Sequence, residues 1–213
     1  VLTATVSPAA AATPATASSA SQSFTPGDLV RLKRVSDPQV SPDGRQVAFV
    51  LRETDMDADR GRTHLWLLDL GAKGATPRQL TRNPAGESNP RWAPDGGSLF
   101  FLSARSGSSQ VWRIPLTGGE AQQVTDFPLE VGTLKVAPAG DRLAVTMHVF
   151  PDCANLECTA DRLEERSNSK ATGVRYDQLF IRHWDVWEDG TLSTLFTTAV
   201  GADGNARDAV NVS

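Results

Sequence analysis

Short runs of apolar residues recur along this chain, separated by polar segments rich in turn-forming residues. The runs cover residues 46–51, 98–102 and 142–149 and are rich in Val, Leu and Phe. Nearly unbroken runs of this length predict strands that are buried on both faces of a sheet. A short strand precedes each run, so we expect pairs of antiparallel strands joined by tight turns.

The turn that precedes each apolar run has a recurring sequence. It reads Ser41-Pro42-Asp43-Gly44, then Ala93-Pro94-Asp95-Gly96, then the degraded Ala137-Pro138-Ala139-Gly140. Proline presets the backbone angle of the second turn position, Asp bonds to its own backbone and Gly adopts the left-handed conformation. Successive copies lie about 45–50 residues apart, which is the spacing of propeller blades or a similar array.

Two further strands complete each repeat. The third contains a Trp, in residues 64–69 and 110–114, and the fourth is polar, in residues 78–81 and 122–125. Four antiparallel strands per repeat describe a propeller blade. We therefore predict an all-β fold: a partial β-propeller of about three blades, with the start of a fourth. The approximate blades are residues 38–82, 88–126 and 132–200.

The two ends of the chain differ from the repeats. Residues 1–22 contain no charge and are mostly Ala, Thr, Ser and Pro, which predicts a disordered linker or the remnant of a signal peptide. A short helix is expected next, with Thr25 as N-cap, Pro26 in its first position and Leu29, Leu32 and Val35 at helical spacing. Residues 201–213 are expected to be a linker into a further blade, within a propeller domain spanning 23–213.

The third repeat is interrupted by an insertion, residues 151–176. It contains the two cysteines, Cys153 and Cys158, which predict a local disulfide in an exported protein and two free thiols in a cytosolic one. A charged stretch, 161–166, predicts a short helix, and the blade is expected to resume at 179–187 and continue through 193–198. Three blades do not close a propeller, so we expect a fragment of a longer protein.

Composition excludes several classes of function. The formal net charge is −4, so the chain lacks the basic surface expected of a nucleic-acid-binding protein. No apolar run approaches the roughly 18 residues of a membrane-spanning helix. We expect neither nucleic-acid binding nor a membrane span.

Candidate catalytic and metal motifs are incomplete. The Asp55–Gly61 segment resembles a calcium loop but lacks Gly at its sixth position and Glu at its twelfth. Gly86–Pro90 lacks the closing Gly of a nucleophile elbow. No nucleophile is evident beside His64, His148 or His183. Two or three of the five Trp residues recur at blade spacing, which favours packing between sheets over ligand binding. We assign no catalytic residue, cofactor or metal ligand.

The repeated turn, the apolar strand and the Trp-bearing strand together resemble the PD40 type of blade. Such blades form TolB-like propellers and the N-terminal propellers of serine peptidases of the prolyl oligopeptidase (S9) family. Two segments, residues 24–44 and 182–196, are similar to the acylaminoacyl-peptidase and dipeptidyl-aminopeptidase branch. The resemblance covers about residues 24–200.

The resemblance implies a serine peptidase whose propeller caps an α/β-hydrolase domain and restricts access to short peptides. A signal-peptide remnant in residues 1–22 would make that peptidase periplasmic or secreted. That domain, with its nucleophile elbow, is absent from this chain and would be the propeller's partner. In dipeptidyl peptidases a propeller glutamate commonly holds the substrate's free amine. Glu164 and Glu165 in the insertion are candidates for this contact, and a solvated helix face is the alternative.

Two other functions remain open at this point. A TolB-like periplasmic propeller would act as a protein-binding module with no enzymatic activity. A calcium- or sugar-binding propeller would rest only on the Asp55 loop and the set of Trp residues.

Overall fold

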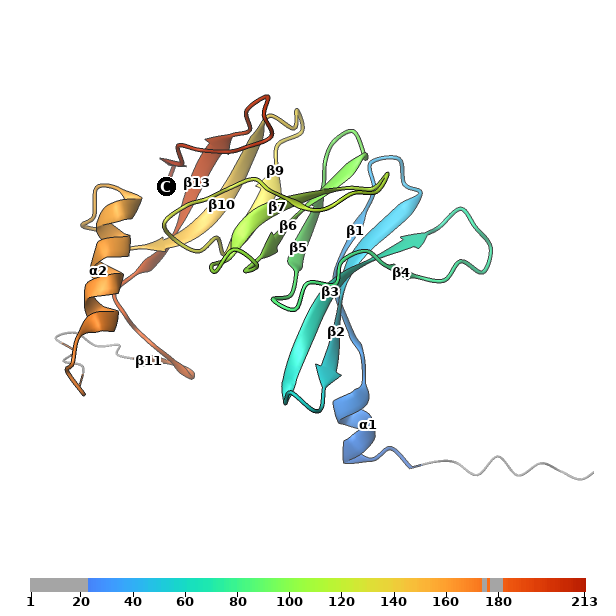
Figure 1. Ribbon diagram of the computed structural model, residues 1–213, viewed down its shortest axis with the longest axis horizontal. Coiled ribbons are helices and arrows are strands. Elements are labelled where there is room, and N and C mark those ends of the chain that lie inside the picture. Colours follow the sequence, from blue (N-terminus) through green and yellow to red (C-terminus); the bar gives the residue numbers. More distant parts are fainter. Residues whose placement is uncertain (1–22, 174–175, 177–181) are drawn as a thin grey trace, which may run out of the picture. The chain divides into compact units, whose positions relative to one another are not determined.

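A computed structural model describes residues 23–173, 176 and 182–213, except for the side chain of His183 (Figure 1). The chain divides into two compact units, Val1–Arg31 and Leu32–Ser213. The described part of the first unit contains the helix α1, Pro26–Arg31, and the second contains all the strands.

The start of α1 is fixed by reciprocal capping bonds. The Asp28 amide donates to Thr25 Oγ1 at 3.2 Å, and the Thr25 amide donates to the Asp28 carboxylate at 2.9 Å. The predicted helix start is therefore confirmed, but the helix ends at Arg31, before the predicted Val35. Val35 instead pairs with Leu51 in a sheet, since cross-strand bonding outweighs local helical periodicity.

Strands of the second unit form three four-stranded antiparallel sheets, which confirms the predicted blades. Blade 1 has the order β1-β2-β3-β4, blade 2 has β5-β6-β7-β8, and blade 3 has β9-β10-β13-β14. The strand bounds are β1 Arg34–Val40, β2 Gln46–Asp55, β3 Arg60–Asp69, β4 Arg78–Gln79, β5 Ser88–Trp92, β6 Ser98–Ser103, β7 Gln110–Pro115, β8 Gln122–Gln123, β9 Thr133–Val136, β10 Arg142–Val149, β13 Leu192–Ala199 and β14 Val210–Asn211.

The recurring turns join the first two strands of each blade with the same backbone bonds. The amides of Gly44, Gly96 and Gly140 donate to the carbonyl three residues earlier at 2.9, 2.9 and 2.8 Å. All three glycines have φ between 69° and 76°, which is the left-handed region. In the first copy, Asp43 also accepts a bond from the Ser41 hydroxyl at 2.6 Å. The third copy keeps the turn without its Asp, because the glycine and the backbone bond remain.

Turns of neighbouring blades pack proline against glycine. A Cβ atom added to Gly96 would lie 3.8 Å from Pro42 Cδ, and one added to Gly140 would lie 3.3 Å from Pro94 Cδ. The motif therefore shapes the turn within one blade and also allows the next blade to approach closely.

Two apolar clusters lie between the sheets. One joins blades 1 and 2 and includes Ala48, Leu65, Leu99 and Phe101. The other joins blades 2 and 3 and includes buried residues from both sheets, among them Phe100, Leu102, Val111, Leu143, Val145 and Met147. Neighbouring residues of β6 thus point to opposite clusters, because side chains alternate across a strand. All six residues of β6 are buried, as an unbroken apolar run predicts.

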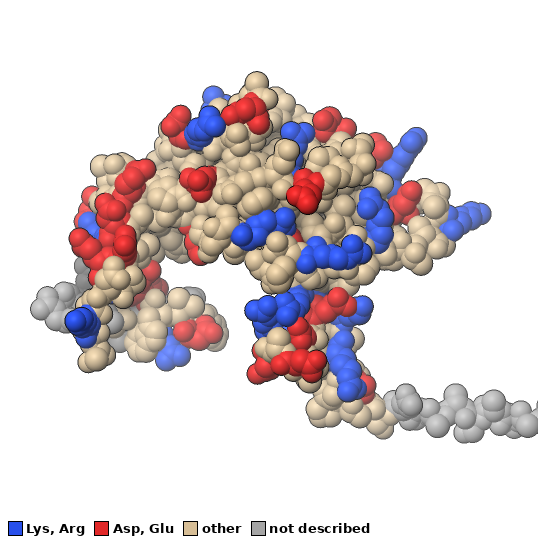
Figure 2. Space-filling view, viewed as in Figure 1, with Lys and Arg blue, Asp and Glu red and all other residues tan. Residues whose placement is uncertain are grey.

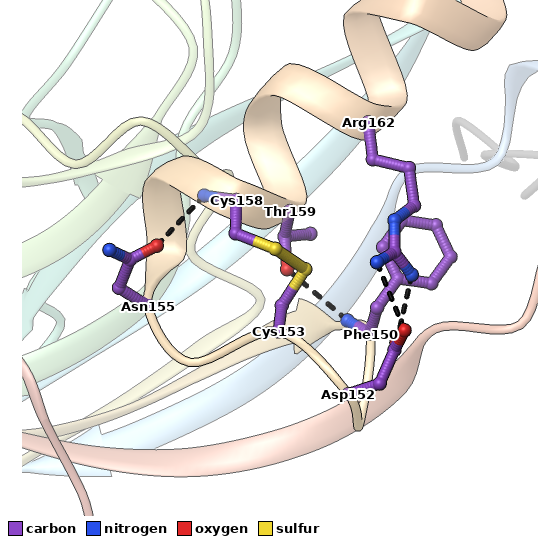
Figure 3. The surroundings of a disulfide bond; sticks show 7 residues. All are labelled: Phe150, Asp152, Cys153, Asn155, Cys158, Thr159 and Arg162. Atoms are coloured by element: carbon purple, nitrogen blue, oxygen red, sulfur yellow. Dashed lines mark hydrogen bonds and ion pairs between the residues drawn. A yellow bond between two sulfur atoms is a disulfide. The ribbon is translucent and has the colours of Figure 1, made fainter.

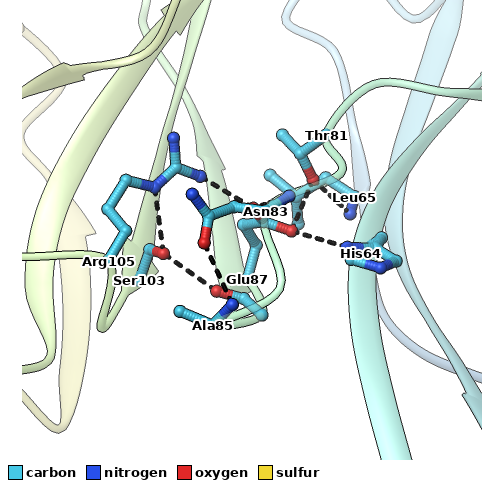
Figure 4. A network of polar contacts seen from close by, with 9 residues as sticks. His64, Leu65, Thr81, Asn83, Ala85, Glu87, Ser103 and Arg105 are labelled. Atoms are coloured by element: carbon cyan, nitrogen blue, oxygen red, sulfur yellow. Dashed lines mark hydrogen bonds and ion pairs between the residues drawn. The ribbon is translucent and has the colours of Figure 1, made fainter. Parts of the chain in front are cut away.

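A buried carboxylate connects blades 1 and 2 (Figure 4). Glu87 Oε1 accepts hydrogen bonds from Arg105 Nη2 at 2.7 Å and from the Asn83 amide at 3.2 Å. Its Oε2 accepts the Thr81 hydroxyl at 2.8 Å and lies 2.9 Å from His64 Nδ1. The Glu87 side chain is completely buried, so these four partners replace the water that it loses.

Blade 2 contains a similar buried polar centre around the side-chain amide of Gln110 in β7. Gln110 Oε1 accepts the Thr125 hydroxyl at 2.8 Å, and its amide donates to the Phe127 carbonyl at 3.0 Å. Thr81 and Thr125 both end the polar fourth segment of a repeat, and each hydroxyl also accepts a backbone amide of the third strand at 2.9 Å. Both repeats therefore contain a buried polar centre beside this threonine, and only the centre around Glu87 is charged.

Blade 3 differs from the sequence prediction in two places. Residues 182–187 do not resume the blade; β11 (Arg182–His183) and β12 (Val186–Trp187) form a separate hairpin, and the predicted strand residues 179–181 lie outside the described part. Residues 201–213, expected to be a linker, contain β14, which pairs with β13 as the fourth strand. Pairing between strands determines the structure of residues 182–187 and 201–213, because neither segment has a strong periodic pattern of apolar residues.

We predict that Glu87→Gln destabilises the protein by about 3 kcal/mol, because it leaves Arg105 without a counter-charge in a buried site. Urea denaturation would measure the change. Glu53→Gln is the matched control, since Glu53 pairs with Lys33 on the surface and should contribute less than about 1 kcal/mol. Equal effects of the two substitutions would show that the buried centre does not stabilise the junction.

A second prediction concerns the turn glycines. Gly96→Ala should destabilise the fold by roughly 1–2 kcal/mol, because φ at Gly96 is 69° and a Cβ there strains the backbone. Gly97→Ala, next in sequence and without a left-handed φ, should change the free energy of unfolding much less. Thermal denaturation of both variants would reveal whether the turn conformation or merely the local sequence matters.

Candidate functional site

The insertion of blade 3 is the candidate functional site. It leaves the sheet after β10 and returns at β13, and its main element is α2, Leu156–Asn168. Figure 1 shows α2 and β11 beyond the ends of β10 and β13, at the same end of the sheets as the β2–β3 connection.

A disulfide closes the first turn of the insertion (Figure 3). It joins Cys153 and Cys158, whose Cα atoms are 5.6 Å apart. Within the loop, the Asn155 side chain accepts a hydrogen bond from the Cys158 amide at 2.9 Å and caps α2. The sequence placed both cysteines in the insertion, and the structure adds that their loop forms the helix start.

One face of α2 packs against the blades. Leu156, Ala160 and Leu163 contact the cluster between blades 2 and 3. Thr159 is fully buried, and its hydroxyl accepts the Phe150 amide at 3.2 Å. The helix is therefore held to the end of β10 by apolar contact and by one buried hydrogen bond.

Two arginines connect the following turns of α2 to the residues just after β10. Arg162 donates two hydrogen bonds to the Asp152 carboxylate, at 2.8 and 3.0 Å. These bonds hold the pKa of Asp152 below its usual range. The guanidinium groups of Arg162 and Arg166 each lie 4.6 Å from the centre of the Phe150 ring. Phe150 thus receives two cation–π contacts, which orient the helix.

Acidic residues occupy the solvent face of α2. Glu157, Asp161, Glu164 and Glu165 are all exposed, and Figure 2 shows acidic side chains gathered over this part of the molecule. The predicted amine-contact residues differ in position: Glu165 lies on the solvent face, and Glu164 lies beside the packing face, one turn after Ala160. Both are accessible to solvent, and their contact with a substrate stays a prediction.

A cavity of about 740 Å³ lies between the outer parts of blades 2 and 3 and the disulfide loop. Its lining includes Gln123, Phe127, Asn155, Phe196 and Arg207. The cavity is lined by both polar and apolar groups, so its lining does not indicate one class of ligand.

The β11–β12 hairpin presents aromatic residues to solvent. Trp184 is 85% exposed and Trp187 is 54% exposed. The prediction that the Trp residues pack between sheets is thus wrong for these two, whereas Trp92 and Trp112 do pack against the cluster between blades 1 and 2. The two exposed residues lie in the β11–β12 hairpin, which is not part of a blade, so the spacing of the repeat does not predict their burial.

The histidines differ in their surroundings. His64 contacts the buried Glu87, and His148 Nδ1 lies 3.4 Å from the Thr191 hydroxyl. The Thr191 hydroxyl donates a hydrogen bond to the Asp189 carboxylate at 2.7 Å, so the hydroxyl proton points away from His148. Burial opposes ionisation of Asp189, but the hydrogen bonds from Thr191 hold its pKa below the usual range. This arrangement caps a turn and does not activate a nucleophile.

The Asp55 loop has protein partners in place of a cation. Asp55 accepts the Ala58 amide at 3.1 Å and Arg62 Nε at 2.7 Å. Among the described residues, no group of three or more His, Cys, Asp or Glu side chains is arranged to hold a metal ion. Within the same residues, neither helix is long and apolar enough to cross a bilayer.

Comparisons with known proteins agree with this geometry. Residues 31–169 match the family described as PD40, the TolB beta propeller domain. An uncharacterized peptidase, YuxL of Bacillus subtilis, is 32% identical over 125 residues, which cover 58% of this chain and 19% of that protein. Dipeptidyl-peptidase 5 of Porphyromonas endodontalis is 26% identical over 82% of this chain and 24% of its own length.

A solved structure shows the same fold at low sequence identity. The acylaminoacyl peptidase of Pyrococcus horikoshii superposes with a TM-score of 0.56 over 86% of this chain and 26% of that one, at 14% identity. This chain thus spans about a quarter or less of the two curated relatives. Its repeated turns, its four-stranded blades and the family match show that the chain belongs to the PD40 family of β-propeller domains, of the kind found in S9-type peptidases.

Proposed function

We propose that this chain is the substrate-selecting propeller of an exported S9 serine peptidase that hydrolyses short peptides. The observation that carries the proposal is the relationship to dipeptidyl-peptidase 5, which extends over 82% of the chain. The catalytic α/β-hydrolase domain, with its Ser, Asp and His, would lie outside these 213 residues and would be the propeller's partner.

Selection by size requires a propeller that does not open. The described junctions support this rigidity in three ways: apolar clusters, proline–glycine contacts between turns, and the polar centre around Glu87. Because the insertion is fastened to blade 3 by Thr159 and Arg162, it can hold a fixed position beside an incoming peptide. Glu164 and Glu165 would offer accessible carboxylates to the peptide's free amine.

Export to the periplasm or the exterior is supported by the cysteines. The disulfide Cys153–Cys158 accounts for both cysteines of the chain. Disulfides persist in oxidising compartments and are rare in the cytosol. The alternative, a TolB-like protein-binding module of the periplasm, would share this chemistry but has no peptidase partner domain.

The test of the main proposal is turnover. The purified 213-residue chain should not hydrolyse aminoacyl-nitroanilides, because it lacks the nucleophile, the acid and the base. The product of the coding region together with its downstream sequence should hydrolyse them, and a serine-directed inhibitor should abolish the activity. Inhibitor-sensitive turnover by the chain alone, or an inactive longer product, would overturn the proposal.

Replacing both cysteines should weaken the anchoring of α2. We expect the double variant Cys153→Ser, Cys158→Ser to have a free energy of unfolding lower by up to about 2 kcal/mol, since the closed loop is short. This corresponds to a melting temperature lower by roughly 4–8 °C. Dithiothreitol should lower the melting temperature of the wild type and leave the variant unchanged. A thiol assay on protein from an oxidising compartment should find no free cysteine.

A further inference from the structure

The β11–β12 hairpin concentrates exposed apolar surface on six residues. Trp184, Val186 and Trp187 are 85, 66 and 54% exposed. Neither of the two apolar clusters between the blades includes any of them. Large apolar side chains that stay this exposed at one tip form the kind of surface that marks a binding site.

The backbone at the tip is strained. His183 pairs with Val186, so Trp184 and Asp185 form a two-residue turn, and φ at Trp184 is 53°. Hairpin turns of this length usually place Gly, Asn or Asp at such left-handed positions. A bulky residue there raises the energy of the fold, and strained residues of this kind cluster at ligand sites.

The second tryptophan is held in place by its neighbours. The Tyr176 ring is stacked on Trp187 with centroids 5.9 Å apart, and the Arg182 guanidinium lies 5.3 Å from the Trp187 ring centre. These contacts orient the indole while about half of the residue stays accessible. An aromatic surface that is already ordered loses little conformational entropy when a ligand stacks on it.

The charge around the tip is negative. Asp185 and Glu188 are exposed beside the tryptophans, while Arg182, the neighbouring cation, lies over Trp187. A ligand with an acidic group would be repelled, and an uncharged or cationic one would be accepted.

The size of the patch argues for a small ligand. A stable protein–protein interface needs about 20–30 residues on each side, and this hairpin offers six. One or two aromatic rings are enough, however, to hold a single side chain of a peptide. We propose that the β11–β12 hairpin is a subsite that binds a large apolar side chain of a short peptide. This inference rests on the proposed peptidase function and names the part of the chain that reads the substrate.

Indole signals test the proposal directly. The chain has five tryptophans, so ¹⁵N-labelled indole groups give five assignable NMR signals. Titration with Ala-Phe-Ala amide should shift the signals of Trp184 and Trp187 and leave those of Trp66, Trp92 and Trp112 in place. Ala-Asp-Ala amide should produce no shift.

Two variants sharpen the test. Trp187→Ala should weaken binding of Ala-Phe-Ala amide about tenfold. The melting temperature should change little, because Trp187 is 54% exposed, lies outside both apolar clusters and loses only its surface contacts with Tyr176 and Arg182. Met56→Ala is the matched control: Met56 is 60% exposed in the β2–β3 connection, and its removal should not affect the affinity. In the longer peptidase, Trp187→Ala should raise KM about tenfold for substrates with Phe and leave kcat and Ala substrates unaffected.

The outcomes separate this inference from the proposed function. Unmoved indole signals, or equal shifts of all five, would overturn the subsite even if the longer protein is an active peptidase. Signals of Trp184 and Trp187 that move only when the separately expressed remainder of the longer protein is added would identify a domain contact and also overturn it. An inactive longer protein would refute the peptidase function, while the titration would still decide whether the hairpin binds peptides.

Discussion

Close approach of one blade to the next is the constraint on which the rest of this structure depends. The proline of one turn lies against the glycine of the following turn, at Pro42 and Gly96 and again at Pro94 and Gly140. A side chain in the glycine position would strain the turn, and at Gly140 it would also crowd the proline. Where the turns lie this close, the apolar faces of neighbouring sheets pack together, and the residues of both clusters are buried from water.

The polar centres add specificity to that packing. Glu87 is buried with four partners drawn from blade 1, blade 2 and the connection between them, and Gln110 forms a similar buried centre within blade 2 and its following connection. An unpartnered carboxylate would be costly here, so only the arrangement that brings Arg105 and His64 together is compatible with burial. The Glu87 centre therefore adds directional contacts between blades 1 and 2 to the apolar contact between their sheets.

Against this rigid background the insertion is the variable part. Its helix is fastened to blade 3 by the disulfide loop, by Thr159 and by the pair of Asp152 and Arg162. Its hairpin instead presents aromatic residues that are largely exposed to solvent. This arrangement would suit the proposed selection of substrates. The repeats form a packed scaffold, and the insertion carries exposed acidic and aromatic side chains that could contact a ligand.

The sequence by itself determined the blades. Turn chemistry and strand periodicity are local properties, so the repeated Pro-Asp-Gly turn and the apolar runs were sufficient to predict four-stranded units and the N-cap at Thr25. Tertiary structure decided what depends on distant partners: the strand at Val35, β14 in the expected linker, the separate hairpin with Trp184, and the burial of Glu87. The threonines at 81 and 125, which end equivalent segments, were the one local signal of the polar centres. The burial of Glu87 could not be predicted from its sequence, because the carboxylate is removed from water only when two blades pack together.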